Sequence, residues 1–289
     1  MLDVLKTPHK TKSSAFLFQT HLVNTYIRER LEQLVSQASD LCDVYLLIPK
    51  PNKIDTEHLA RFLSGLDIGV VTYDTYDVFE NAFGFRQEEF RRAFYKTEYI
   101  PFILFLEQFS GYNYLWRCEY DVFYSGDWAS FISHFSEEEY DFISTNIYEF
   151  YGKKPHWKHW WKARSFDDFK SQPIKTKSML RSHNGIFGMS SGFAETLRKN
   201  VTNFRGHYEI VLPTMAKRFN HSIRDIGGFG EYVLDCDKGK YYVTTQDVPG
   251  LRESLSGTYG SHGNYFIRDS YEIDMLYHPV KVNTNEYSY

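Results

Sequence analysis

The feature that most constrains the fold is an alternation of apolar runs and amphipathic helical segments along the first part of the chain. Residues 14–21, 43–49 and 69–73 are short, apolar runs rich in β-branched or aromatic side chains, which predicts buried strands. Between them, residues 24–35 and 55–66 carry apolar side chains at helical spacing. Repetition of strand and helix predicts an α/β fold with a mostly parallel central sheet and helices on both faces.

The rest of the chain continues this pattern less regularly. Asn24 is placed to cap the first helix, and Pro101 is expected to interrupt a helical region over 87–109. A polar, Trp-rich stretch over 151–178 predicts a long loop or lid. The other expected elements are strands over 112–118, 140–146 and 182–189 and helices over 131–135, over 191–200 and from His207 onward. Without a repeat or a linker, we expect one domain, residues 1–289.

Composition fits such a domain. The 289 residues are 42% hydrophobic and 24% charged, and a chain of this length buries a core large enough to fold without a disulfide or a structural metal. The cysteines Cys42, Cys118 and Cys236 lack the spacing of a zinc site or a disulfide framework. The formal charge of −4 and the lack of a long basic run argue against a nucleic-acid partner. Because the fold does not need a structural metal, any bound metal is expected to take part in catalysis.

The sequence predicts no secretory or membrane-spanning segment. Its first ten residues contain no apolar core as long as a signal peptide needs. The longest apolar stretch, residues 99–106, is too short to span a bilayer and contains Pro101. We expect a protein of the cytoplasm that is either soluble or attached peripherally at the inner face of the membrane.

Two acids follow the expected strand over 112–118. Glu119 and Asp121 are separated by one residue, so both side chains point to the same face if the extended geometry continues. Paired carboxylates at the carboxyl end of a strand favour a hard divalent cation, which takes oxygen ligands and shares them with substrate phosphates. A diphosphate ligand is thus implied. The alternative is a solvated turn, in which such acids are also common.

The segment from Trp116 to Trp128 resembles the GT-A superfamily of nucleotide-sugar glycosyltransferases, of the bacterial polysaccharide type. In that superfamily an Asp-x-Asp motif after about the fourth strand holds a metal on the donor diphosphate. The matching positions are Glu119 and Asp121, so this chain has the Glu-x-Asp variant. The resemblance implies that Asp121 binds the metal directly, and that Glu119 contacts ribose or metal-bound water. It also implies a nucleotide-binding half, residues 1–128, and an acceptor half, residues 129–289.

His278 and Lys281 lie in the C-terminal part of the chain. Many GT-A enzymes bring a C-terminal histidine back to the metal site, so the resemblance implies that His278 is a third ligand. Neutral imidazole suits Mn²⁺ better than Mg²⁺, which makes Mn²⁺ the favoured cofactor of the two. Lys281 would neutralise the diphosphate. The alternative is that both are ordinary polar residues of the tail.

Glu209 begins the expected helix after His207. Inverting GT-A enzymes carry a catalytic acid at this place, so the resemblance implies that Glu209 takes the proton from the acceptor hydroxyl. A carboxylate in the first turn is also stabilised by the helix dipole alone, which leaves a purely structural role open.

Other positions match the donor-binding strand ends of the superfamily. Asn184 and Gly185 correspond to the strand that lines the donor sugar, although they are equally compatible with a turn or bulge. By topology, the residues that follow the first and third strands would bind uracil and ribose; they are Gln19, Thr20, His21 and Asp74.

The stretch 151–178 carries two histidines, His156 and His159, among tryptophans. Because two histidines without a third partner are a weak metal signal, we interpret it as an acceptor-side lid. A surface loop with packed tryptophans is the alternative. Aromatic residues make up 18% of the chain, which weakly favours a carbohydrate ligand, since sugar rings stack on aromatic faces.

The sequence therefore predicts a metal-dependent glycosyltransferase that moves a sugar from a nucleotide sugar, a UDP-sugar above all, to a saccharide or lipid-linked acceptor. One alternative is a nucleotidyltransferase, although the residues after the first strand lack its glycine-rich basic loop. Glycosidase chemistry with paired carboxylates is another. A carbohydrate-binding protein without catalysis on the same fold is the last.

Overall fold

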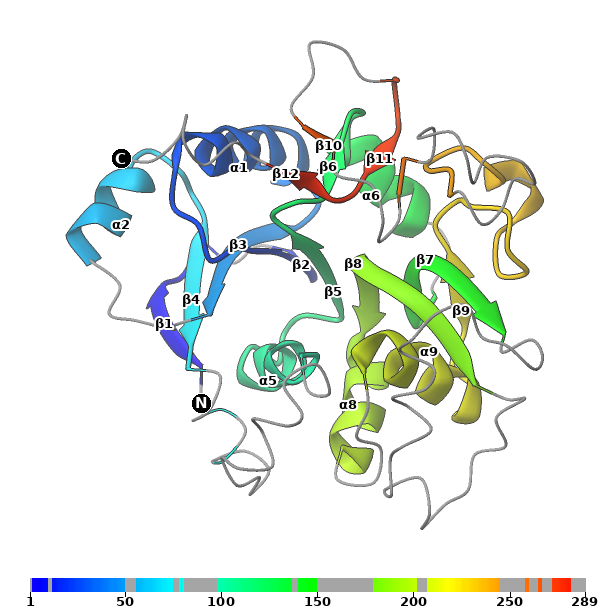
Figure 1. Ribbon diagram of the computed structural model, residues 1–289. Coiled ribbons are helices and arrows are strands. Elements are labelled where there is room, and N and C mark those ends of the chain that lie inside the picture. Colours follow the sequence, from blue (N-terminus) through cyan, green and yellow to red (C-terminus); the bar gives the residue numbers. More distant parts are fainter. Residues whose placement is uncertain are drawn as a thin grey trace.

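A computed structural model describes residues 2–9, 12–49, 56–74, 78, 80, 98–136, 140–149, 179–201, 207–244, 258–259, 265–266 and 272–281. Its centre is an eight-stranded sheet (Figure 1). The strands of this sheet are β1 (Asp3–Lys6), β2 (Ser14–Gln19), β3 (Asp43–Pro49), β4 (Gly69–Tyr73), β5 (Tyr114–Glu119), β7 (Phe142–Glu149), β8 (Leu180–Ser190) and β9 (Ile223–Asp225). They lie in the order β1-β4-β3-β2-β5-β8-β7-β9.

The first half of the sheet is parallel. Strands β2, β3, β4 and β5 run in one direction, as the alternation of strand and helix predicts, and β1 adds an antiparallel edge. Beyond β5 comes β8, which is antiparallel to both of its neighbours, while β7 and β9 are parallel. The predicted α/β class with a mostly parallel central sheet is confirmed. The antiparallel insertion of β8 is a feature that the linear pattern does not reveal.

Helices cover both faces of the sheet, as predicted (Figure 1). The first face is covered by α1 (Thr25–Ala38), α2 (Thr56–Phe62) and α6 (Trp128–Ser136), and the second by α5 (Ile100–Gln108), α8 (Ser191–Asn200) and α9 (Tyr208–Arg218). A short 3-10 helix, η4, spans Asp235–Asp237. Each face encloses its own apolar core because side chains alternate along every strand.

Strand β5 shows how this alternation prepares the site. Trp116 and Cys118 are buried in the core on the α1 side, where the Trp116 ring lies 5.7 Å from that of Phe131. Leu115 belongs to the other core. Arg117 points to that same side, where its guanidinium lies 5.4 Å from the Phe102 ring of α5. An apolar strand thus carries one buried cation just before its acidic end.

Most expected boundaries agree with the structure to within a few residues. Asn24 caps α1 by accepting a hydrogen bond from the Ile27 amide at 3.0 Å, as predicted. Pro101 lies in the first turn of α5, where proline needs no amide partner, so the described part of this helical region begins beside it. Whether Pro101 interrupts a longer helical region remains a prediction. The expected helical residues 87–97 lie outside the described part.

Of two further small sheets, one pairs the C-terminal segment with the middle of the chain and the other lies within the C-terminal segment. One pairs β6 (Phe123–Tyr124) with β11 (Leu276–Tyr277), antiparallel, and the other pairs β10 (Tyr265–Phe266) with β12 (Val280–Lys281), parallel. Figure 1 shows this red C-terminal segment beside β6 and above the end of β5. Residues far apart in sequence are therefore neighbours at the carboxyl end of β5.

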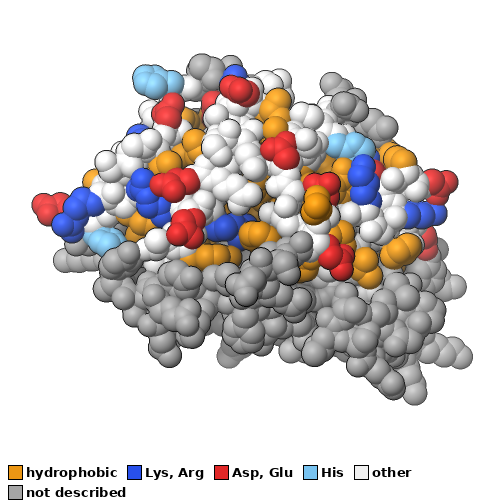
Figure 2. Space-filling view, turned by 90° about the horizontal axis from the view of Figure 1, so that it is seen from above, with side chains coloured by type: hydrophobic (Ala, Val, Ile, Leu, Met, Phe, Trp, Pro, Cys, Tyr) orange, Lys and Arg blue, Asp and Glu red, His pale blue; other side chains and the backbone are white. Residues whose placement is uncertain are grey.

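Within the described residues, no helix is both long and apolar enough to cross a membrane. Figure 2 views the molecule from above, the side on which α1 and α6 lie in Figure 1. On this face acidic and basic side chains are interspersed, and no continuous basic surface extends over the described residues.

Candidate metal centre and adjoining cavity

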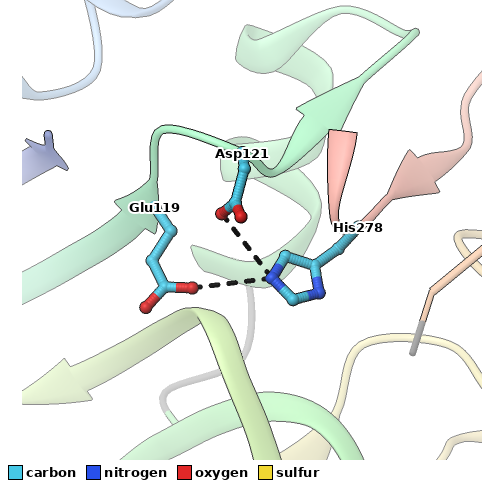
Figure 3. A group of neighbouring side chains, drawn as sticks. All are labelled: Glu119, Asp121 and His278. Atoms are coloured by element: carbon cyan, nitrogen blue, oxygen red, sulfur yellow. Dashed lines mark ion pairs between the residues drawn. The ribbon is translucent and has the colours of Figure 1, made fainter. Parts of the chain in front are cut away.

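The candidate centre begins where β5 ends. Glu119 is the last residue of β5, and the chain turns at Tyr120 and Asp121, closed by a hydrogen bond from the Val122 amide to the Glu119 carbonyl at 3.1 Å. Extended geometry therefore stops at Glu119. The two acids were expected to share one face only if the strand continued to Asp121, and it does not. The turn nevertheless brings both carboxylates towards one imidazole (Figure 3).

That imidazole belongs to His278, between β11 and β12. The antiparallel pairing of β11 with β6 positions the segment, and the Val280 amide donates to the Asp121 carbonyl at 2.7 Å. The His278 amide donates to the Thr258 carbonyl at 3.0 Å. Backbone hydrogen bonds on both sides of His278 therefore hold its ring over the turn.

The three side chains form a compact donor set. His278 Nε2 lies 3.6 Å from Glu119 Oε2 and 3.6 Å from Asp121 Oδ1, and one ligand atom from each residue lies within 4.8 Å of the others (Figure 3). Ligands held about 2.1 Å from one ion lie roughly 3 to 4.2 Å apart. Two carboxylate oxygens and one imidazole nitrogen fit a divalent cation such as Mn²⁺ or Mg²⁺.

Arg117 binds one of these carboxylates, that of Glu119. Its Nη2 donates to Glu119 Oε1 at 2.6 Å, its Nε donates to Gln19 Oε1 at 2.8 Å, and its Nη1 donates to the Asn184 carbonyl at 2.5 Å. Burial opposes ionisation of Glu119, but the charge of Arg117 and the neighbouring His278 together hold the pKa of this carboxyl below its ordinary value. Glu119 is therefore a fixed anion.

A cavity of about 280 Å³ adjoins the centre. It opens over the carboxyl ends of β2 to β5, where ligands gather in sheets of this kind. Five of the predicted site residues line it, together with six that the sequence did not single out as site residues. The lining consists of Gln19, Thr20, His21, Pro49, Tyr73, Glu98, Pro101, Arg117, Glu119, Tyr120 and Asp121.

The predicted nucleoside contacts differ in how they are held. The Gln19 amide bridges Arg117 and the Tyr73 hydroxyl, to which it donates at 2.9 Å. The Thr20 hydroxyl is buried and donates to the Leu22 carbonyl at 3.0 Å. His21 is exposed, with its ring edge-on to Tyr120.

Asp74 follows β4 directly. It is not among the described residues that line this cavity. Its predicted contact with ribose remains a prediction.

The two predicted residues of β8 serve the packing around the site. The Asn184 side chain is fully buried; its Oδ1 accepts from the Ser144 hydroxyl at 2.7 Å and its Nδ2 donates to the Tyr208 carbonyl at 3.2 Å. At Gly185, a Cβ atom would lie 2.5 Å from the Tyr259 hydroxyl oxygen and 3.2 Å from His278 Cδ2. The absence of a side chain at Gly185 thus allows His278 its position.

Glu209 lies in the first turn of α9, behind a second group of histidines. Its carboxylate oxygens lie 3.3 Å from His207 Nδ1 and 3.7 Å from His183 Nε2. The His183 ring in turn packs edge-on against that of His278, with centroids 4.7 Å apart. Burial, followed by the charge of Glu119, raises the pKa of Glu209 well above its ordinary value. The candidate base is therefore linked to the metal group through His183.

Sequence reasoning did not single out Arg117, Glu98, His183 or Tyr208 as site residues; the Tyr208 hydroxyl lies 3.5 Å from Glu119 Oε1. A signal existed only for Arg117, the one charged side chain in the expected strand over 112–118. The side chain of Lys281 and the residues His156 to Trp161 lie outside the described part, so their roles remain predictions.

Comparison with known proteins gives no family. No protein-family model matches the chain, and no curated protein matches its sequence. Among solved structures, the mannosyltransferase Ktr4p from S. cerevisiae is similar with a TM-score of 0.41 and 8% identity, covering 77% of this chain and 74% of that one. The galactosyltransferase LgtC is similar with a TM-score of 0.42 and 9% identity, covering 74% and 73%.

A 4-diphosphocytidyl-2C-methyl-D-erythritol synthase from Anaerococcus prevotii is similar with a TM-score of 0.43 and 7% identity, covering 74% of this chain and 86% of that one. Because all three TM-scores lie below 0.5, none of these likenesses assigns an activity to this chain.

Proposed function

We propose that this protein is a metal-dependent glycosyltransferase of the GT-A type, which transfers a sugar from a nucleoside diphosphate sugar to a hydroxyl group of an acceptor. The observation that carries the proposal is the convergence of Glu119, Asp121 and His278 at the edge of the cavity over the strand ends. UDP-sugars are the first donors to test. A saccharide or lipid-linked saccharide, made at the inner face of the membrane, is the acceptor that the sequence resemblance implies.

The donor set supports a diphosphate ligand. Three protein ligands leave coordination positions of a divalent cation open, and Mg²⁺ and Mn²⁺ commonly fill them with substrate phosphates. The imidazole favours Mn²⁺ over Mg²⁺. When bound, the cation would neutralise the charge that develops on the leaving diphosphate. Asp121 and His278 would hold it, with Glu119 as a third ligand that Arg117 orients.

The acceptor hydroxyl must lose a proton as it attacks the sugar, and Glu209 is the proposed base. Its raised pKa makes its carboxylate a stronger base than an exposed glutamate, and its oxygens lie 3.7 Å from His183 Nε2 and 3.3 Å from His207 Nδ1, which restrict its position. An inverting reaction follows from this role. Retention of anomeric configuration would argue for another arrangement.

Release of the nucleotide tests the proposal. Purified protein is incubated with UDP-sugars and GDP-sugars, with Mn²⁺ or with a chelator, and with saccharide acceptors. We expect nucleoside diphosphate to be released only with the cation. Release of pyrophosphate from a sugar phosphate and a nucleoside triphosphate would identify a nucleotidyltransferase instead. Binding of saccharides without any turnover would identify a carbohydrate-binding protein.

A further inference from the structure

Glu98 is a cavity residue with no assigned role. It directly precedes Tyr99, the capping residue of α5, and its side chain lines the cavity together with Arg117 and Glu119. Desolvation and, next, the charge of Glu119 raise the pKa of its carboxyl to about 7, while Arg117 opposes the rise. The carboxyl is thus poorly hydrated and faces the space where a ligand would lie.

Four other acceptor oxygens of the cavity already face a guanidinium or an imidazole. Glu119 Oε1 accepts from Arg117, and Glu119 Oε2 faces His278, as Asp121 Oδ1 does. The Gln19 carbonyl oxygen accepts from Arg117. Glu98, by contrast, makes no hydrogen bond or ion pair with any residue that the structure describes. Among the described residues, its two oxygens thus have no partner that would compete with a ligand.

A carboxyl group in this position restricts which part of a ligand it can meet. Phosphate groups repel it, so it must face hydrogen-bond donors. Hydroxyl groups both donate and accept hydrogen bonds, and so pair with a carboxyl group whether or not it is ionised. Two neighbouring hydroxyls match the two oxygens of one carboxylate, as when an acidic residue binds ribose.

We infer that Glu98 binds a pair of neighbouring hydroxyl groups of the nucleotide-sugar donor and is a specificity-determining residue of this cavity. The inference rests on the proposed function. Such hydroxyls exist on the ribose and on the transferred sugar, and two arms of one binding experiment distinguish them.

The first arm measures the dissociation constants of UDP, GDP and their 2′-deoxy analogues with Mn²⁺, by calorimetry. Wild type is compared with Glu98→Gln, Glu98→Ala and the control Glu107→Gln, which changes an exposed carboxylate near the other end of α5. If Glu98 binds ribose, wild type and Glu107→Gln prefer the ribonucleotide by about tenfold. The preference falls in Glu98→Gln and vanishes in Glu98→Ala.

The second arm measures how much the hexosyl group adds to affinity, as the ratio of the dissociation constants of UDP and UDP-glucose and of GDP and GDP-mannose. If Glu98 binds the transferred sugar, Glu98→Ala loses most of this gain and Glu98→Gln part of it. Thermal unfolding shows that each variant is folded, and the near-isosteric Glu98→Gln keeps the test valid if Glu98→Ala is not.

Unchanged ratios in both arms, with a wild type that binds nucleotide, overturn this inference and leave the proposed function standing. An equal loss of affinity for ribo- and deoxynucleotides, with no change in the hexosyl gain, also overturns it and points to the base. If wild type binds none of these nucleotides, the proposed function itself fails.

Discussion

Arg117 Nη2 donates to Glu119 Oε1 at 2.6 Å, from a guanidinium that is only 3% exposed. The pair lies directly under the candidate metal centre, and the same guanidinium binds Gln19 of β2 and the carbonyl of Asn184 in β8. One buried cation therefore fixes a metal-facing carboxylate and joins three neighbouring strands at their site-forming ends.

Loss of the Arg117 guanidinium should destabilise the fold. Because Arg117→Met leaves the Glu119 carboxylate without its main counter-charge, we expect the free energy of unfolding to fall by about 3 to 5 kcal/mol, measured by urea denaturation. Arg198→Met is the control: Arg198 pairs with Glu107 at 3.3 Å on the surface, and its loss should cost less than about 1 kcal/mol. Equal, small losses of unfolding free energy in the two variants would show that Arg117 stabilises the fold no more than a surface ion pair does.

Glu98 should make stability depend on pH. Its pKa is raised from 4.5 to about 7 in the folded state, so the folded protein holds this proton more tightly than the unfolded chain does. The stability that the protonated group contributes is fully present below about pH 4.5 and is lost as the pH rises through about 7. Glu98→Gln, which stays neutral, should therefore gain on wild type by up to about 3 kcal/mol between pH 4.5 and pH 8. Urea denaturation across this range tests it; a constant difference would refute the shifted pKa.

Gly185 should be intolerant of a side chain. In Gly185→Ala the new methyl group meets the Tyr259 hydroxyl and His278, so we expect a loss of about 1 to 3 kcal/mol in stability. Displacement of His278 should also weaken Mn²⁺ binding by about tenfold. Gly192→Ala in α8 is the matched control, because its nearest neighbour, Ser190 Oγ, lies 3.8 Å away. Unaltered Mn²⁺ affinity in Gly185→Ala would mean that His278 is not held by this contact.

Glu209→Gln should separate binding from transfer. The change keeps the size of the side chain but removes its ability to accept a proton, so turnover should fall by at least about 10²-fold while Mn²⁺ and UDP affinities stay within about threefold. Turnover is followed by product formation and affinities by calorimetry. A variant as active as wild type would assign the base elsewhere or indicate retention.

Local patterns predicted much of this fold because they reflect which side of an element is buried. The apolar runs 43–49 and 69–73 form β3 and β4 with the same bounds, and Asn24 caps its helix. The acid pair was found because it follows a strand directly. The position of β8 beside β5 was not predicted, because it depends on pairing between segments that are distant in sequence.

The same reason explains the missed site residues. His183 can be recognised as a site residue only from its contacts with Glu209 and His278. These three residues come from three separate segments of the chain. Glu98 is one acid among many until the carboxyl ends of distant strands enclose it. The sequence around His183 and Glu98 does not indicate either arrangement.

The most direct test of the metal centre is Mn²⁺ binding to wild type, Asp121→Asn and Asp127→Asn, measured by calorimetry with and without UDP. Asp127 is an exposed carboxylate that accepts a hydrogen bond from the Ser130 amide, and asparagine can replace it in that contact. We predict that wild type and Asp127→Asn bind Mn²⁺ and gain affinity for UDP with it. Asp121→Asn should lose both, by at least about 10²-fold. Mn²⁺ binding to Asp121→Asn with wild-type affinity would contradict the assignment of Glu119, Asp121 and His278 as a metal centre.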